Sequence, residues 1–426
     1  MTTKNLLVEL FVEELPPKAL KKLANAFATE LWVRLADATL VDRNQPVEID
    51  KNLFPYATPR RIAVLIKDVL TKAPDRPVSQ KLMPVSVGLD ANGNPTPALL
   101  KKLATLGAAP SAANSLKRQM DGKAEALFFD SVASGATLTE GLQKALDEAL
   151  AKLPIPKVMG YQLADGWTTV HFVRPAHGLV ALHGADIVPI ATLGLTASRE
   201  THGHRFEAKV DPIVLKNADS YAAQLEAEGS VIASFTARRA EIEKQINAAA
   251  AKAGANLKPV SDEDLLDEVT ALVERPNVLT GQFEKEYLDV PQECLILTMK
   301  ANQKYFPLLD SAGKLTNQFL IVSNISPADT SAVIQGNERV VRPRLADAKF
   351  FFDQDRKKTL ASRIPGLAKV VYHNKLGTQG ERSERVRAIG HAIVNQLRMA
   401  THPYTPLAKD ELDVLDSKVQ EAARLA

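Results

Sequence analysis

The sequence contains a single cysteine and no long apolar run. Cys294, being alone, excludes an internal disulfide and a CxxC metal-binding knuckle, and we expect it to be a small buried side chain. No apolar stretch approaches the roughly eighteen residues that a membrane span requires. The start, MTTKNLLVEL, lacks the basic region and the cleavage site of a signal peptide, so we expect a cytoplasmic protein without a membrane partner.

Nucleotide-binding and hydrolase signatures are also missing. The pairs Gly122-Lys123 and Gly313-Lys314 stand outside any GxxxxGKS/T pattern, so no phosphate-binding loop is predicted. No GxGxxG pattern follows a strand, and no GxSxG nucleophile elbow occurs. A complete ATP-using active site is therefore not expected in this chain.

The size and composition are those of a globular protein with several domains. At 426 residues the chain exceeds one ordinary core, so two to four domains are expected. Hydrophobic residues make up 45% and charged residues 24%, as in ordinary globular proteins. The net charge of +3 is too small to indicate a nucleic-acid-binding protein. Any such function must therefore depend on local patches.

Hydrophobic periodicity predicts a multidomain α+β fold with mixed or antiparallel sheets and packed helices, since strand and helix patterns do not alternate regularly. Strand patterns cover 6–12, 62–69, 168–174, 187–193, 278–283, 295–298 and 319–323. Helix patterns cover 20–38, 137–153, 235–253, 262–274, 382–399 and 409–425. Residues 73–97 are rich in proline, glycine and asparagine, which favours loops and turns.

Local signals refine two of these helices. Thr137 with Glu140 and Ser261 with Asp264 form capping-box patterns at the two helix starts. Paired prolines end the first helix, and we place a domain boundary near residue 157.

The stretch GNERVVRPRLADAKFFFDQDRKKTL, residues 336–360, concentrates the positive charge. Extended to residue 363, it has eight basic and four acidic residues, a balance of +4 against +3 for the whole chain. Pro343 suits the first turn of a helix, where its missing N–H would have had no partner. Leu345, Ala348 and Phe352 recur at helical spacing, so we expect this apolar stripe to dock on a core.

Arg342, Arg344 and Lys349 would then lie near the open end and on the solvent face of that helix. Guanidinium groups beside free backbone N–H groups form a cradle for phosphate. The segment is therefore a candidate polyanion site, supported by a buried ridge of phenylalanines. The alternative is a set of ordinary solvated charges around a core helix.

The same stretch resembles the most recognisable block of the bacterial glycyl-tRNA synthetase β subunit. Further matches follow in order: VEL..EELPPKAL at 8–20, TPRR at 58–61, KLPIPK at 152–157, HFVRPAH at 171–177, GHRF at 203–206 and MKANQKYFPL at 299–308. A colinear series of this kind is far more specific than a single motif. Phe11 and Val12 stand where members of that family commonly have small residues.

The resemblance implies the β subunit of an α2β2 glycine–tRNA ligase, which binds and positions tRNA(Gly). The smaller α subunit makes glycyl-adenylate with ATP and Mg, so no catalytic residue, cofactor or metal is expected on this chain. The absence of His-Ile-Gly-His and Lys-Met-Ser-Lys synthetase signatures agrees with that division. The chain would be an N-terminal portion of such a subunit.

Three domains are expected, the first from the boundary near residue 157 and the other two from the resemblance. Residues 1–157 are expected to form an N-terminal α+β domain. Residues 158–365 would form a central α+β domain similar to a module of the phenylalanyl-tRNA synthetase β chain. Residues 366–426 would be the incomplete helical start of an HD-type domain.

A second candidate site follows the predicted strand at 168–174. Arg174, His202, His204 and Arg205 can donate to phosphate or stack on unpaired bases. The alternative is a strand-end arginine bonded to a carboxylate, with two surface histidines. A metal site at the two histidines lacks a third ligand at useful spacing.

A third candidate follows the apolar run at 295–298. Lys300 and Lys304 beside Tyr305 could combine charge contact with stacking on RNA, although a solvated loop fits equally well. The complete set of candidate tRNA-binding residues is Arg174, His202, His204, Arg205, Lys300, Lys304, Arg339, Arg342, Arg344, Arg356 and Lys357.

Two other functions stay open. An HD-type helical start raises the possibility of a metal-dependent phosphohydrolase, but the dipeptide His-Asp occurs nowhere, and His373, His391 and His402 have no adjacent acidic residue. The other is an assembly scaffold whose basic segment meets an acidic patch of the α subunit instead of RNA.

Overall fold

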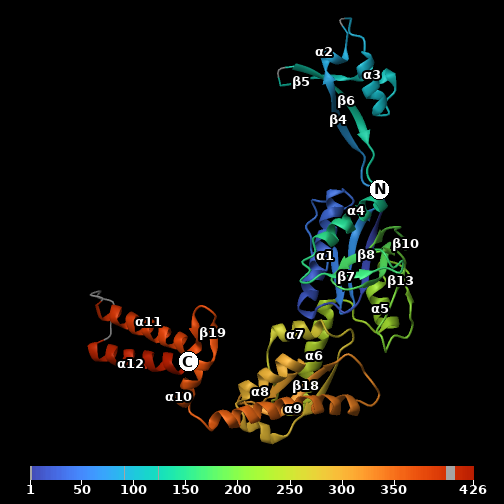
Figure 1. Cartoon of the computed structure of the whole chain (residues 1–426). Helices are drawn as coiled ribbons and strands as arrows, with labels where there is room; N and C mark the ends of the chain where they lie inside the picture. The colour runs from blue at the N-terminus through green and yellow to red at the C-terminus, as the bar shows by residue number, and fades with distance from the viewer. Residues whose placement is uncertain (1, 91, 123, 400–407) are drawn as a thin grey trace.

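The computed structural model describes residues 2–90, 92–122, 124–399 and 408–426. Figure 1 shows an extended, curved molecule with an N-terminal body (2–75 and 134–234), an arm (76–133), a central body (235–359) and a C-terminal segment (from 360). None of the helices in the described ranges combines the length and apolar character needed to cross a membrane.

The N-terminal body is built on a five-stranded antiparallel sheet with the order β10-β9-β1-β3-β2. Its strands and helices are β1 (Thr3–Val12), β2 (Leu53–Thr58), β3 (Arg61–Leu70), β9 (Ala176–His183), β10 (Asp186–Ile187), α1 (Pro17–Asp37), α4 (Leu138–Ala151) and α5 (Tyr221–Gly229). Side chains of a strand alternate between its two faces. Leu6, Val8 and Leu10 of β1 therefore pack with α1 and α4, while Leu7 packs with α5 on the opposite face.

Several predictions for this body are confirmed. The strands at 6–12 and 62–69 and the helix at 20–38 are present, and Thr137 and Glu140 form the predicted capping box. β9 and β10 follow residue 157 in sequence, yet β9 pairs with β1. The sheet thus continues across the position where we expected a domain boundary.

Short hairpins surround the sheet. They are β7 (Met159–Gln162) with β8 (Thr169–Phe172), β11 (Ala191–Thr192) with β12 (Leu195–Thr196), and β13 (Glu200–Thr201) with β14 (Ile213–Val214). The strand predicted at 168–174 is confirmed as β8. The single strand predicted at 187–193 is wrong, because the chain there divides into β10 and β11. Pro189 lies between them, and proline cannot donate to a strand ladder.

The arm is an insertion between β3 and α4 that projects from the N-terminal body (Figure 1). Its elements are β4 (Arg76–Pro84), β5 (Lys117–Asp121), β6 (Ala124–Ala133), α2 (Val85–Gly88), α3 (Pro97–Thr105) and η1 (Pro110–Ser115). Leu99, Leu103 and Leu127 form its small core. The prediction that loops dominate 73–97 is wrong, since β4 and α2 lie there. β4 has no fully buried residue, so its sequence lacks an apolar strand pattern.

The central body contains a four-stranded antiparallel sheet with the order β15-β17-β18-β16. Its elements are β15 (Lys258–Pro259), β16 (Asn277–Gln282), β17 (Phe306–Leu309), β18 (Leu315–Ser323), α6 (Phe235–Ala253), α7 (Glu263–Thr270), η2 (Lys285–Asp289), α8 (Gln292–Thr298), the π-helical turn η3 (Met299–Gln303) and α9 (Ser331–Arg356). Leu308 and Leu320 pack with α6 and α7, and Phe319 packs with α8 and α9 on the other face. The predicted helix at 235–253 and the strands at 278–283 and 319–323 are confirmed.

Three predictions in the central body are wrong. The helix at 262–274 is shorter, and its cap is Asp262 rather than Ser261, with the Asp262 carboxylate accepting a backbone N–H at 2.9 Å. Residues 295–298 belong to α8 and not to a strand, because a short apolar run fits either structure. Cys294, in the same helix, is exposed rather than buried.

α9 also differs from expectation. The predicted helix starts at Pro343, but α9 starts at Ser331 and contains Pro343 in its interior. At 1.5 Å per residue, Pro343 lies roughly 18 Å along the axis from the helix start. The predicted cradle of free N–H groups beside Arg342 and Arg344 is therefore absent from this described helix. The predicted docking stripe is confirmed, since Leu345 is fully buried and Ala348 and Phe352 pack on the same core.

The C-terminal segment consists mainly of two helices. Its elements are α10 (Leu360–Arg363), η4 (Ile364–Lys369), β19 (Val371–His373), β20 (Gly377–Thr378), α11 (Gln379–Met399) and α12 (Lys409–Leu425). Figure 1 shows α11 and α12 side by side and apart from both bodies. The helices predicted at 382–399 and 409–425 are confirmed, whereas an HD-type domain stays a prediction. His391 contacts Asp416 at 2.9 Å, and His402 lies outside the described residues.

Candidate nucleic-acid interface

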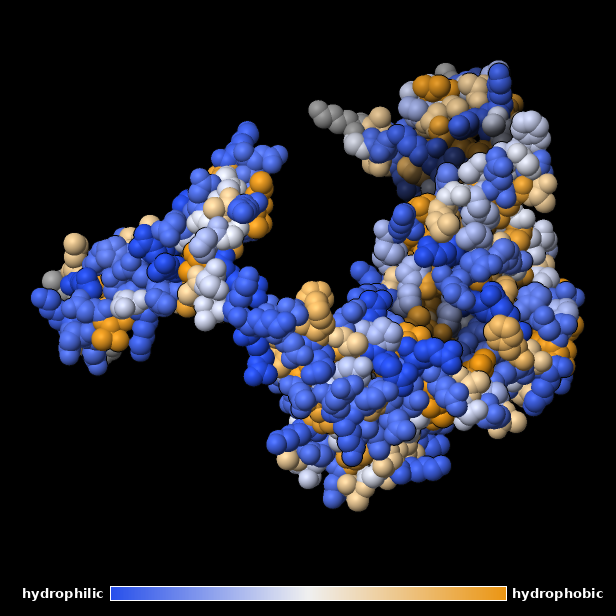
Figure 2. All heavy atoms as spheres, turned by 60° about the horizontal axis from the view of Figure 1, so that its bottom comes forward, coloured by the Kyte–Doolittle hydropathy of each residue, from blue (hydrophilic) through white to orange (hydrophobic). Residues whose placement is uncertain are grey.

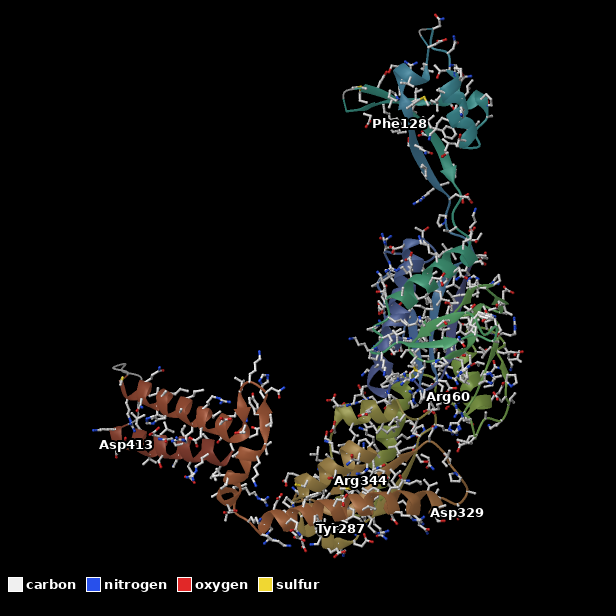
Figure 3. The ribbon with its side chains drawn as sticks, in the orientation of Figure 1. Arg60, Phe128, Tyr287, Asp329, Arg344 and Asp413 are labelled. Atoms are coloured by element: carbon white, nitrogen blue, oxygen red, sulfur yellow. The ribbon has the colours of Figure 1, made fainter. Side chains whose placement is uncertain are left out.

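α9 and its C-terminal cap carry the largest group of candidate residues. They are Arg339, Arg342, Arg344, Arg356 and Lys357, all exposed. The Arg342 Nε donates to Glu284 Oε1 at 2.6 Å, and the Arg356 guanidinium lies 5.4 Å from the centre of the Phe352 ring. Within the described ranges, Arg339 and Arg344 have no side-chain partner. Figure 3 labels Arg344 on this helix.

The buried phenylalanine ridge predicted beneath these cations is wrong. Phe350 and Phe351 are 57% and 64% exposed, and only Phe352 of the three packs on the core. One helix face can cover only side chains three or four residues apart, so three consecutive phenylalanines cannot all be buried there. The cations of α9 consequently lie on a partly apolar surface.

A groove between the two bodies gathers a second group of cations. We call it the lysine groove, a cavity of about 1100 Å³ between α1 on one side and α7, α8 and η3 on the other. Its basic residues are Lys18, Lys21, Lys22, Lys152, Lys300 and Lys304, and its acidic residues are Glu30, Asp262, Asp264, Asp267 and Glu268. In Figure 1, α1 and α7 lie along the inner side of the curve, and Figure 2 shows that side as mainly hydrophilic.

Most lysines of the groove are held by carboxylates. Lys21 Nζ lies 2.8 Å from Asp267 Oδ2, Lys304 Nζ lies 3.1 Å from Glu268 Oε1, and Lys300 pairs with Asp262. The hydrogen bond from Lys300 lowers the pKa of Asp262. Lys18 and Lys22, by contrast, are exposed on α1 and have no side-chain partner in the part of the chain that the structure describes.

A buried charge cluster lies where the two bodies meet, and Figure 3 labels Arg60 at this junction. Arg60 Nη2 lies 2.7 Å from Glu274 Oε2, and Arg61 lies 3.6 Å from Glu9 and 3.7 Å from Glu274. All four side chains are at most 10% exposed. Burial alone would raise the pKa of the Glu274 carboxyl, but Arg61 and Arg60 outweigh that effect and lower it.

This cluster fixes the loop that carries the candidate histidines. Arg60 donates to the carbonyl of Gly203 at 2.7 Å, and Arg61 donates to the carbonyl of His202 at 2.5 Å. His202 contacts Asp211 at 2.8 Å, while His204 is 1% exposed. Arg60 and Arg61 thus position the backbone of the loop at 202–204. Within that loop, the His202 side chain contacts Asp211, whereas the His204 side chain is buried.

Arg174 and Arg205 lie near the same end of β1. The Arg174 Nε donates to the carbonyl of Glu14 at 3.0 Å, and Arg205 lies 3.9 Å from Glu13. The alternative considered for Arg174 was a bond to a carboxylate, and its partner is a backbone carbonyl instead. Among the described residues, no cluster of three histidine, cysteine or carboxylate side chains is arranged to hold a metal ion.

The candidate residues thus occupy three places rather than one. Arg174, His202, His204 and Arg205 surround the end of β1, the two central lysines line the groove, and the rest lie on α9. Sequence reasoning missed Lys18 and Lys22, whose signal is the KALKK run at the start of α1. It also missed Phe206, which is 79% exposed beside Arg205.

Comparisons with known proteins agree along the chain. A family model described as glycyl-tRNA synthetase beta subunit matches residues 6–426. The glycine–tRNA ligase beta subunit of Leptothrix cholodnii is 73% identical over 426 residues, covering 100% of this chain and 59% of that protein. The corresponding proteins of Dechloromonas aromatica and Thiobacillus denitrificans are 66% and 70% identical, over 100% and 93% of this chain. The chain covers 60% and 56% of their lengths.

Proposed function

The chain belongs to the glycyl-tRNA synthetase beta subunit family, and we propose that it binds and positions tRNA(Gly) for the attachment of glycine by a glycine–tRNA ligase. Bond formation takes place on a partner α subunit in this proposal. This chain contributes orientation of the tRNA, which accelerates a reaction by holding the reactants in place. The names of the relatives do not favour a metal-dependent phosphohydrolase.

The observation that carries the proposal is the presence of exposed cations without carboxylate partners among the described residues, both in the lysine groove and on α9. Lys18 and Lys22 open onto the lysine groove, and Arg339 and Arg344 are exposed on α9. Exposed cations without carboxylate partners can form phosphate contacts at little cost, because no ion pair has to break. The buried arginines at the junction cannot take that role, since Glu9 and Glu274 occupy them.

The remaining parts of the reaction belong to the assembled enzyme. ATP and Mg are proposed to bind the α subunit, with no cofactor on this chain. An α2β2 heterotetramer in the cytoplasm is the proposed working form. The start of an HD-type domain at 366–426 is retained as part of this proposal, whereas the boundary near residue 157 is not, because β9 pairs with β1 across it.

Binding measurements on this chain test the proposal. We expect labelled tRNA(Gly) to bind with an affinity that falls linearly in a plot of log K against log salt, because each phosphate contact releases counterions. The α subunit and tRNA are then offered separately. Binding to α alone, with no RNA binding at low salt, would replace the proposal with the assembly scaffold.

A further inference from the structure

A second cavity, beside the buried charge cluster, is lined by several aromatic and imidazole rings. It has a volume of about 290 Å³, and Phe11, His202, His204 and Phe206 line it. The rings of Phe11 and His202 are 5.1 Å apart between centroids, and those of His204 and Phe206 are 6.2 Å apart. Phenylalanine, tyrosine and tryptophan make up only 5% of the chain. We call this cavity the aromatic pocket.

The pocket is held in shape by buried contacts. Arg60 stacks over Phe11 at 5.3 Å from the ring centroid and holds the carbonyl of Gly203 at 2.7 Å. A Cβ on Gly203 would lie 2.6 Å from the Cα of Gly229, so the loop is pressed against the neighbouring backbone. The cavity is therefore preformed, as small-molecule and nucleotide sites usually are.

His204 leaves one polar atom unused. Its Nδ1 accepts the backbone N–H groups of Phe206 at 3.2 Å and Glu207 at 3.1 Å, which places the ring proton on Nε2. That Nε2 is buried and has no hydrogen-bond partner among the described residues. Because this atom has almost no accessible surface, His204 contributes the wall of the pocket and not a polar contact to a ligand.

The charges at the rim decide which ligand fits. Asp211 lies 2.8 Å from His202, and Glu13 lies 3.9 Å from Arg205. These carboxylates oppose a free polyanion, so charge alone cannot provide recognition. The exposed ring of Phe206 can provide it, because a nucleobase stacks on an aromatic face whatever its sequence.

We propose that the aromatic pocket receives one unpaired nucleotide of an RNA, with its base against Phe206 and its phosphate towards Arg205. Arg205 is 55% exposed and more than an ordinary hydrogen-bond distance from Glu13, so it can turn towards a phosphate. The inference rests on the proposed function and deepens it, since it assigns a single-strand contact separate from the phosphate contacts of the lysine groove.

The test compares a short single-stranded RNA with a blunt RNA duplex of equal charge, using the whole chain. We expect Phe206→Ala to weaken single-strand binding by about tenfold, the loss typical of one stacked base. Duplex binding should stay unchanged. Phe206→Trp should retain single-strand binding, and the fluorescence of the new indole should be quenched when the base stacks on it. Because Phe206 is 79% exposed, these variants should melt at the temperature of the unchanged protein.

Each alternative outcome has a distinct meaning. Equal single-strand affinity for Phe206→Ala and the unchanged protein overturns the pocket proposal while leaving the proposed function standing. Failure to bind both RNAs overturns both. Adenosine monophosphate is the last competitor tested against the labelled RNA strand. If it displaces that strand as strongly as unlabelled RNA does, and only when Phe206 is present, the pocket binds free nucleotides. The assignment to RNA is then wrong.

Discussion

The buried charge cluster and the lysine groove use neighbouring cations in opposite ways. Arg60 and Arg61 adjoin in sequence, as Lys21 and Lys22 do, but both arginines are buried against Glu9 and Glu274. Lys22 is exposed and has no side-chain partner among the described residues. Two adjacent basic residues therefore have a structural role where carboxylates surround them. Where no carboxylate is near, a basic residue is available to bind a ligand. The comparison predicts which substitutions change stability and which change RNA affinity.

Removing the shared carboxylate of the cluster should have the largest effect. Glu274→Ala leaves Arg60 and Arg61 buried without their partner, and breaking a buried pair on one side costs roughly 3–5 kcal/mol. We expect denaturant unfolding to show this loss. Glu284→Ala is the matched control, because its partner Arg342 is 46% exposed and such pairs contribute roughly 1 kcal/mol or less. Equal losses for the two variants would contradict the comparison.

The pH dependence sharpens the same test. The lowered pKa of Glu274 means that its contribution to stability is present above the ordinary glutamate pKa of 4.5 and is lost as the pH falls through its lower folded-state value. The difference in unfolding free energy between the unchanged protein and Glu274→Gln should therefore be complete at neutral pH and shrink on acidification below 4.5. If the difference in unfolding free energy grew on acidification, the proposed ionised state of Glu274 would be contradicted.

The lysine groove should give the next largest effect, on affinity alone. Lys18→Ala with Lys22→Ala should weaken tRNA(Gly) binding by roughly fivefold for each lost phosphate contact at physiological salt, and should reduce the salt slope. Lys101→Ala with Lys102→Ala provides a control, because these lysines are exposed on α3 of the arm. An equal loss of tRNA affinity in the control would contradict the prediction, because it would indicate a general effect of charge.

α9 allows a comparison within a single helix. Arg344→Ala should weaken tRNA binding by roughly fivefold, whereas Arg342→Ala should weaken it less, because Arg342 is held by Glu284 at 2.6 Å. The double variant should flatten the salt dependence. If its slope matches that of the unchanged protein, α9 makes no phosphate contact.

Much of the fold could be predicted because the spacing of apolar residues within a short segment indicates whether it forms a strand or a helix. The strand at 6–12 alternates between two cores, and the helix at 235–253 carries its apolar positions at helical spacing. β4 was missed because its exposed residues leave no such pattern. Pro343 was misplaced because proline is common at a helix start, although packing of Val341 and Leu345 holds it inside α9.

The candidate site was less predictable, since tertiary contacts decide which cations are free. Lys21 and Asp267 are 246 residues apart in sequence, so no local pattern indicates their ion pair. The same applies to Lys300 and Lys304, whose partners lie on or before α7. The KALKK run can be read in the sequence, but only the structure shows that Lys18 and Lys22 line the groove.

The smallest effect concerns an occupied cation of the groove. Lys304 has a positive φ of 59°, so Lys304→Ala would mix a backbone effect with the loss of charge. Glu268→Gln avoids this difficulty, because it releases Lys304 from its partner at 3.1 Å without altering that backbone. If the freed ammonium group reaches RNA phosphate, tRNA affinity should rise by about twofold, less than a full contact because the lysine is partly buried.

Its control removes the same charge from the same helix. Glu263→Gln removes one carboxylate partner of Arg239, which keeps its contact with Asp267 at 2.8 Å and does not line the groove. A general increase in positive charge would raise affinity equally in both variants, since long-range attraction depends on the total charge. A rise confined to Glu268→Gln would therefore locate the contact at Lys304, and equal rises would contradict the assignment of this lysine to the RNA-binding surface.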